Sequence, residues 1–387
     1  MPLEWRSAAA QTFIGGRITK VDGFWRAAEI SGGIVDLIKE WQLWDVAFGP
    51  LAKQMRKDWE TYSKGPSLAA GLTAKAAKTV GLGSDRALGS EIHAALQQYV
   101  TQPLNKLLQD TPLTINFNAL SWFKNQAGFD EYSTMWDRKQ TDNSLNVNPD
   151  PKNPAHVRAK ADRWALYGQF GDGKVDAAAA GLKLAHVKQQ GGVTAAPTWS
   201  HSQGSAGKTP KQVVADSQIF AALNYGRRPH GSNTAYGKSF FELSDDFKDG
   251  AVFFAMDTFT PVSTGSGFKT KDQRSKLYQV TARTFAGSIL LAIKSQYDGN
   301  PNAVNKQNSI ALIVDLLKAA GTCACLPDND QNHLLIEAHL FQKVTMRPDV
   351  VKRVNVSMTE CGTDLDAVKN NLRQFKNRTR IDFALIP

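Results

Sequence analysis

The stretch AALNYGRRPHGSNTAYGKSFFEL, residues 221–243, joins two short apolar runs through a polar crossing. The apolar runs have the composition of strands, and the crossing from Tyr225 to Gly237 carries the Gly, Pro, Ser and Asn residues typical of a loop. Two adjacent arginines, Arg227 and Arg228, stand at the end of the first predicted strand. They are either ordinary surface charges or part of an anion-binding site, and both interpretations are open at this point.

Further strands are predicted on both sides of this stretch. Residues 114–118 alternate polar and apolar side chains, and one helix, at 308–320, interrupts the later strands. A basic helix followed by a short strand is predicted near the end, from about residue 364. The pattern is α+β rather than a regular βαβ repeat. The other predicted strands lie within residues 219–225, 238–243, 251–259, 276–282, 333–341 and 350–357.

The first 112 residues read mainly as helices, because apolar residues recur there at three- and four-residue spacing. We therefore predict a helical N-terminal region over 1–112 and a second domain over 113–387, with long loops at about 138–160 and 190–212. The helical region either docks to a delivery apparatus, shields the second domain or binds a partner such as an immunity protein, or it packs into the core of one larger fold.

The composition is that of a globular chain with a basic excess. Hydrophobic residues make up 42% of the 387 residues, and the formal net charge is +10. This balance favours anionic partners such as nucleic acid, a phosphate-bearing cofactor or an acidic protein. No apolar run approaches the roughly 20 residues that span a bilayer, and the start lacks the pattern of a secretory signal. We expect synthesis in the cytoplasm, which is compatible with delivery into target cells by a specialised secretion system.

Motifs for phosphate-loop and metal chemistry are weak. SQGSAGKT, residues 202–209, has Ser202 where the phosphate-loop motif requires glycine. The histidines are scattered, and the cysteines, Cys323, Cys325 and Cys361, contain no CxxC pair. A zinc site made of these cysteines and His339 is the minor alternative to free cysteines, and no metal is expected.

Glu337 is the most unusual residue of the predicted strands. It lies in the apolar run HLLIEAHLF, residues 333–341, although glutamate is depleted in strands and costly to bury without a partner. His339 follows two residues later, so a regular strand places it on the same face. Glu337 forms a salt bridge to a neighbouring strand, faces water at an edge position, or faces a functional cleft.

Several of these segments resemble bacterial toxin and effector domains of the ADP-ribosyltransferase type. The segments are ALNYGRRPHG, AYGKSFFEL and GAVFFAMDTF, followed after about 80 residues by LLIEAHLF and DVVKRVNVS. They are similar to a poorly characterised bacterial group with ALN…RP.G, YG.S and IEA motifs, and the resemblance covers residues 113–356. It implies a split pair of small β-sheets with packed helices, which binds NAD as substrate in the cleft between them and requires no metal.

The resemblance also implies roles for individual residues. Glu337 matches the catalytic acid. Ser239 matches the hydroxyl that orients this carboxylate, and Ser263 and Thr264 are alternatives for that role. Arg228, or its neighbour Arg227, would hold the diphosphate.

Four further residues belong to this comparison. Tyr236 and His339 are additional candidates for cofactor binding, and Arg138 is a remote alternative for the diphosphate. Leu335 stands two residues before Glu337, where the family often has Gln or Glu, which leaves the acceptor residue open.

The leading hypothesis is therefore an NAD-dependent ADP-ribosyltransferase toxin that modifies a protein or RNA in a recipient cell. NAD glycohydrolysis on the same fold is a close variant. A basic nucleic-acid-binding or nuclease toxin is the second hypothesis, supported by the charge and by KNNLRQFKNRTR, residues 369–380. The third is a non-catalytic interaction protein, in which Glu337 and the arginines only pair within the fold.

Overall fold

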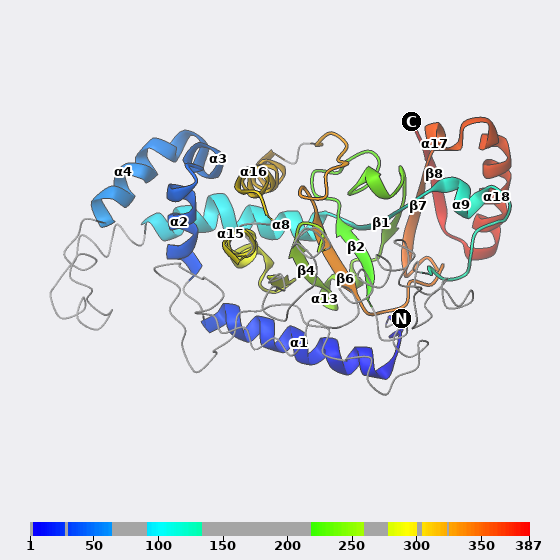
Figure 1. Cartoon of the computed structure of the whole chain (residues 1–387), viewed down its shortest axis with the longest axis horizontal. Helices are drawn as coiled ribbons and strands as arrows, with labels where there is room; N and C mark the ends of the chain where they lie inside the picture. Colours follow the sequence, from blue (N-terminus) through cyan, green and yellow to red (C-terminus); the bar gives the residue numbers. More distant parts are fainter. Residues whose placement is uncertain are drawn as a thin grey trace, which may run out of the picture.

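The computed structural model describes seven ranges of the chain (Figure 1): residues 3–27, 30–63, 91–133, 218–258, 278–299, 304–322 and 325–387. The predicted loops at 138–160 and 190–212 lie outside these ranges. Within them, the chain combines helices with one mixed sheet, and its N-terminal part is helical. None of the helices in these ranges combines the length and apolarity that a bilayer crossing requires.

Eight strands form one continuous sheet in the order β5-β4-β6-β2-β1-β3-β7-β8. The sheet is antiparallel except for the last pair, in which β8 runs parallel to β7. All the predicted strands are confirmed, but the described strands do not divide into the two small sheets that the resemblance implies. The strands are β1 Leu113–Phe117, β2 Ile219–Leu223, β3 Ser239–Leu243, β4 Val252–Ala255, β5 Gln279–Thr281, β6 Ile336–Leu340, β7 Val351–Ser357 and β8 Asp382–Ile386.

The helices come before β1, after β1, between β3 and β4, between β5 and β6, and between β7 and β8. Gln97–Thr101 is a π-helical turn that leads directly into α8. Helix α15 was not predicted from the sequence; it follows β5 and includes the largely apolar run FAGSILLAI. The helices are α1 Ala8–Ala27, α2 Ile30–Glu40, α3 Trp44–Phe48, α4 Ala52–Ser63, α8 Gln102–Asp110, α9 Ala119–Phe123, α13 Asp246–Asp249, α15 Phe285–Gly299, α16 Lys306–Thr322, α17 Met358–Cys361 and α18 Leu365–Thr379.

The two faces of the sheet differ in chemistry, because side chains alternate along each strand. One face is apolar, and α15 packs on it through the rings of Phe285 and Phe253, whose centroids are 5.6 Å apart. Helix α8 contacts both α15 and α16. The opposite face is more polar over its middle strands, where a single row of register partners contains Glu337, Ala222, Thr114, Glu242 and Arg353.

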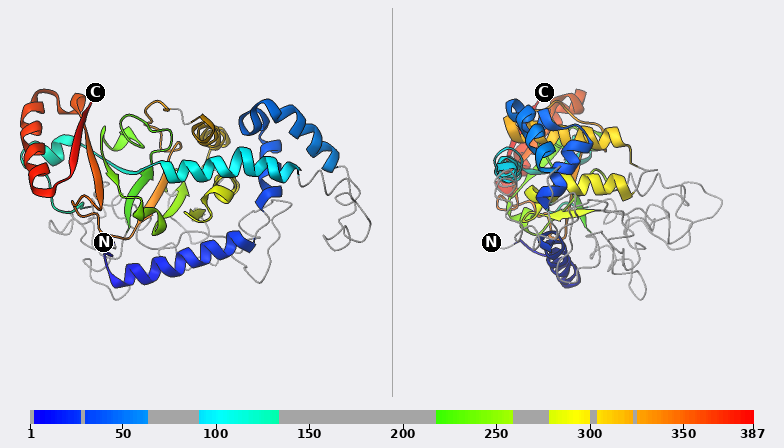
Figure 2. Two further views of the ribbon diagram at one scale, coloured as in Figure 1. Left: turned by 180° about the vertical axis from the view of Figure 1, so that it is seen from behind. Right: turned by 90° about the vertical axis from the view of Figure 1, so that its left-hand side faces the viewer.

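Helix α1 packs on the polar face at its β4–β5 end. Ala10 and Ile14 of α1 belong to a small buried cluster with Val252 and Phe254 of β4 and with Phe341. Figure 1 shows α1 on one side of the strands and α8, α15 and α16 on the other, whereas Figure 2 shows α4 and α18 at opposite ends of the molecule.

Most of the N-terminal helices share the main hydrophobic core with the sheet. One buried cluster extends from Val21 and Trp25 of α1, through α2, α3, α4 and α8, to the strands and to Phe375 of α18. Among the two interpretations of residues 1–112, this packing favours a contribution to the core of one larger fold.

The crossing between β2 and β3 is anchored to the polar face by Asn116 of β1. The amide nitrogen of Asn116 donates to the carbonyls of His230 and Gly237 at 2.7 and 2.9 Å, while its oxygen accepts from the Ser232 hydroxyl at 3.1 Å. Gly237 has φ +122°, and a Cβ there would lie 2.2 Å from the carbonyl oxygen of Phe117. The loop therefore fits the sheet only with glycine at this position.

We expect Gly237→Ala to lower the free energy of unfolding by at least about 2 kcal/mol, because the new methyl group meets backbone that cannot move aside. Urea unfolding followed by circular dichroism measures the change. Gly16→Ala is the matched control: Gly16 lies on α1 with open space around its Cβ position. That variant should gain about 0.5–1 kcal/mol of helix stability. Equal stabilities for the two variants would contradict the assignment.

Candidate active site on the polar face of the sheet

Glu337 is the second residue of β6, on the polar face, and only 5% of it is exposed. Its Oε1 accepts a hydrogen bond from the Thr258 hydroxyl at 2.6 Å and lies 2.6 Å from Nε2 of His339. Burial raises the pKa of Glu337 to about 8, although the hydroxyl and backbone N–H of Thr258 favour the ionised form. Glu337 is thus a buried carboxyl group that can hold or release a proton near neutral pH.

His339 lies beside Glu337 on the same face, as the two-residue spacing predicts. It is 1% exposed, and its ring lies between those of Phe254 and Phe220, with centroids 4.3 and 4.9 Å away. Burial lowers the pKa of His339 to about 3, so the ring is neutral at physiological pH. A carboxylate only accepts hydrogen bonds, so His339 Nε2 donates when Glu337 is ionised and can accept when Glu337 is protonated.

Thr258 reaches Glu337 from a turn that directly follows β4. Met256, the residue after the strand, has φ +64° although it is not glycine, and its N–H donates to the Leu335 carbonyl at 2.7 Å. The Asp257 N–H donates to the Asn332 carbonyl at 3.0 Å. A left-handed conformation at a buried methionine is unfavourable and persists only where the surroundings enforce it. Here it places Thr258 at hydrogen-bonding distance from Glu337.

Tyr236 links the β2–β3 crossing to this turn. Its hydroxyl donates to Asp257 Oδ2 at 2.8 Å, while half of the residue, 50%, is exposed. Burial of the hydroxyl, together with the charges of Asp257 and Glu337, raises the pKa of Tyr236. The predicted candidate Tyr236 therefore lies near Glu337, with its ring partly open to solvent.

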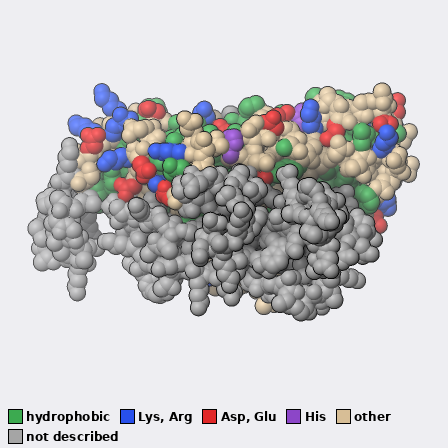
Figure 3. Space-filling view, in the orientation of Figure 1, with side chains coloured by type: hydrophobic (Ala, Val, Ile, Leu, Met, Phe, Trp, Pro, Cys, Tyr) green, Lys and Arg blue, Asp and Glu red, His purple; other side chains and the backbone are tan. Residues whose placement is uncertain are grey.

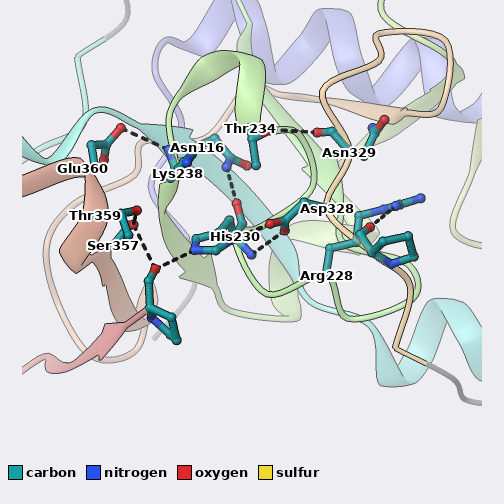
Figure 4. A network of polar contacts seen from close by, with 12 residues as sticks. Asn116, Arg228, His230, Thr234, Lys238, Asp328, Asn329, Ser357, Thr359 and Glu360 are labelled. Carbon is teal, nitrogen blue, oxygen red and sulfur yellow. Dashed lines mark hydrogen bonds and ion pairs between the residues drawn. The ribbon is translucent and has the colours of Figure 1, made fainter.

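Arg228 is held on the α16 side of the crossing. Its guanidinium donates to the Pro327 carbonyl, and Figure 4 shows Arg228 with this contact as a dashed line. The guanidinium also forms an ion pair with Asp315 of α16 at 3.3 Å and lies 5.2 Å from the centre of the Tyr225 ring. Arg228 is 4% exposed. These contacts are those of a residue that joins the crossing to α16.

Arg227 has a different environment. It is exposed and adopts φ +47°, and its charge helps to lower the pKa of Asp110 at the end of α8. Arg227 is thus linked to α8 through its charge, whereas Arg228 contacts α16 and the segment at Pro327; none of these interactions involves the group around Glu337.

Ser239 lies on the opposite face of the sheet from Glu337. It is the register partner of Phe117, whereas Asn116, on the other face, is opposite Phe240. The Ser239 hydroxyl donates to Glu360 at 2.7 Å and accepts from the Ser357 N–H at 3.0 Å. Strand alternation therefore separates Ser239 from Glu337, and the hydroxyl that contacts Glu337 is that of Thr258.

The structure thus brings together two predicted residues besides Glu337, namely His339 and Tyr236, and does not bring Arg228 or Ser239 to them. Sequence reasoning missed Thr258 and Asp257. The available signal was their position directly after the apolar run at 251–256, where strand ends commonly place polar groups. Ser263, Thr264 and Arg138, the remaining alternatives, lie outside the described residues.

No protein-family model and no curated protein matches this sequence. Within the described part of the chain, no group of three or more His, Cys, Asp or Glu side chains is arranged to hold a metal ion. Cys323, one member of the alternative zinc site, lies outside that part, whereas Cys325 is exposed and Cys361 is buried as a free thiol.

Because the pKa values of Glu337 and His339 are shifted in the folded state, we expect the free energy of unfolding to depend on pH. The folded-state pKa of Glu337 is about 8 against an ordinary 4.5, so the folded protein binds more protons and loses stability as pH rises from 4.5 to 8. His339 has the opposite effect between pH 3 and 6.5, where the folded protein binds fewer protons. The two effects oppose each other up to pH 6.5, and above it only that of Glu337 remains.

Glu337→Gln should therefore remove a loss of stability between pH 6.5 and 8, with a slope of at most about 1.4 kcal/mol per pH unit. Urea unfolding at several pH values in this window measures the slope. Glu242→Gln is the matched control, because Glu242 is a half-buried strand carboxylate on the same face, three strands away. It should keep the slope of the parent protein. Identical slopes for Glu337→Gln and the parent would rule out a raised pKa at Glu337.

Arg228→Met should lower the free energy of unfolding by about 2–4 kcal/mol, because it removes one partner of a largely buried ion pair. The loss should lie toward the lower end, since the Asp315 side chain is 26% exposed. Arg227→Gln, at the adjacent exposed position, should change stability by less than about 0.5 kcal/mol. Chemical denaturation of both variants tests this, and a stable Arg228→Met protein would argue against the structural role.

Proposed function

We propose that this protein is an NAD-dependent ADP-ribosyltransferase toxin or effector, which cleaves the nicotinamide–ribose bond and transfers ADP-ribose to a protein or RNA of a recipient cell. The supporting observation is the placement of Glu337: a strand carboxylate held at 2.6 Å by the Thr258 hydroxyl, near the half-exposed Tyr236. The sequence resemblance of residues 113–356 adds support through the same carboxylate.

The reaction needs what this group of residues offers. Cleavage of the nicotinamide–ribose bond builds positive charge on the ribose, and a fixed carboxylate beside it stabilises that charge. Thr258 and neutral His339 can both donate to Glu337 Oε1, which holds the carboxylate in one orientation. A bound cationic nicotinamide ring would also favour ionisation of Glu337, despite its burial. Water in place of the acceptor gives the variant activity, NAD glycohydrolysis.

The nucleic-acid-binding alternative loses support on the C-terminal helix. Three of the basic side chains in residues 369–380 pair with acidic ones: Lys369 with Asp366, Lys376 with Asp382 and Arg378 with Asp130. Figure 3 shows acidic side chains close to basic ones over much of the visible described surface. A phosphate backbone needs unpaired positive charge, so this helix is a weaker candidate than its sequence indicated.

The test is release of nicotinamide from NAD by the purified chain, measured by liquid chromatography with and without lysate from candidate target cells. Glu337→Gln should reduce the rate by about 100-fold or more, as expected for loss of a charge that stabilises a transition state. Thr258→Val should reduce the rate of nicotinamide release by about tenfold. Thr258→Ser should retain most of the activity, because serine keeps the hydroxyl.

Glu242→Gln again serves as the control and should retain parental activity. Labelled ADP-ribose on a macromolecule indicates transfer, whereas free ADP-ribose alone indicates glycohydrolysis. The proposal fails if the parent releases no nicotinamide under either condition, or if Glu337→Gln matches the parent.

A further inference from the structure

The segment at residues 328–335, which leads into β6, joins the β2–β3 crossing to the turn after β4. The N–H and the hydroxyl of Thr234 in the crossing both donate to the Asn329 carbonyl, at 2.8 and 3.3 Å (Figure 4). The Asn332 carbonyl accepts from the Asp257 N–H of the turn at 3.0 Å. The segment therefore contacts both elements that bring side chains toward the candidate catalytic carboxylate.

Asn233 makes the side-chain link between the crossing and this segment. Its Nδ2 donates to Asn332 Oδ1 at 2.9 Å, while its Oδ1 accepts from the Ala235 N–H at 2.9 Å. Asn233 is 1% exposed, and a buried amide that uses both its oxygen and its nitrogen is held in one orientation. The second of these contacts caps the short helical turn Thr234–Tyr236, so Asn233 also fixes the turn that carries the half-exposed tyrosine.

These contacts form a closed circuit of hydrogen bonds. The Tyr236 hydroxyl donates to Asp257 Oδ2 at 2.8 Å, and the Asp257 N–H donates to the Asn332 carbonyl. Asn332 in turn accepts from Asn233, whose oxygen caps the turn of Tyr236. Because each member is held through two neighbours, the loss of one link loosens the others.

The circuit reaches to within one residue of the hydrogen bond to Glu337. Thr258 directly follows Asp257, and its hydroxyl lies 2.6 Å from Glu337 Oε1. The turn needs support, because Met256 is held in a left-handed conformation that is unfavourable for any residue but glycine. An O–H···O hydrogen bond spans only about 2.5–3.0 Å, so a small displacement of Asp257 would break the contact.

We propose that Asn233 and Asn332 are positioning residues of the candidate site. Through Asp257 they hold Thr258 at hydrogen-bonding distance from Glu337. The consequence for catalysis rests on the proposed function, whereas the consequence for the hydrogen bond to the carboxylate does not.

Titration of the Glu337 carboxyl group tests the proposal without reference to any reaction. The group is followed by NMR of the full chain with ¹³C-labelled glutamate, and its signal is identified by its absence from Glu337→Gln. The parent should titrate near pH 8, because burial raises the pKa of Glu337 to about 8. Asn332→Ala should raise this midpoint by about 0.5 or more, since the Thr258 hydroxyl would then favour the ionised form less.

Asn371→Ala is the matched control. Asn371 is a half-buried asparagine of α18, and its amide donates to the Phe123 and Lys124 carbonyls at 2.8 and 3.1 Å. Both variants lose a side-chain link between segments and should be destabilised to a similar extent. Only Asn332→Ala should change the titration of Glu337, whereas a purely structural role of Asn332 would leave both variants at the parental midpoint.

Release of nicotinamide from NAD gives the second readout. Asn332→Ala should lower the rate about three- to tenfold, as expected when a reacting carboxylate loses its fixed orientation. Asn371→Ala should retain the parental rate.

The inference is overturned if Asn332→Ala titrates Glu337 at the parental midpoint. If Asn332→Ala fails to fold, Tyr236→Phe decides the outcome by the same titration, because it opens the circuit at the hydroxyl that Asp257 accepts from. A raised midpoint in a chain whose parent releases no nicotinamide would sustain the positioning role and reject the proposed reaction.

Discussion

The burial of a hydrogen-bonded Glu337–His339 pair on one face of the sheet is the constraint on which the rest of the site depends. A charged carboxylate at this depth is unfavourable unless donors surround it. The structure supplies the Thr258 hydroxyl from the turn after β4 and the neutral ring of His339 from the same strand. The left-handed Met256 is part of the arrangement that brings Thr258 there. The site is therefore built from β6 and the end of its neighbour β4.

One face of the sheet packs into the hydrophobic core, and the other carries the candidate site. The apolar face packs against α15 and merges with the core that most of the N-terminal helices share. The polar face is covered at one end by α1 and holds the β2–β3 crossing through Asn116. Because that crossing is fixed at Asn116 and Gly237, Tyr236 comes to rest near the turn that carries Asp257 and Thr258.

Much of the fold was predictable, because period-two alternation and apolar runs are local signals. The strands and the C-terminal helix follow from them, as does the placement of Glu337 and His339 on one face. The helix α15 was missed because its apolar run resembles a strand segment in composition. The site was predictable only in part. Arg228 and Ser239, which the resemblance assigns to the site of Glu337, form contacts elsewhere in the fold.

The sequence by itself determined most of the α and β segments, the unusual position of an acid within an apolar strand, and a crossing with the composition of a loop. Only the tertiary structure decided which groups meet that acid. Strand order and register are long-range properties, so they alone place Ser239 behind the sheet and Thr258 in front of it. Tertiary packing likewise brings α1, far away in the sequence, onto Phe254, the register partner of Glu337, and no local pattern can specify that contact.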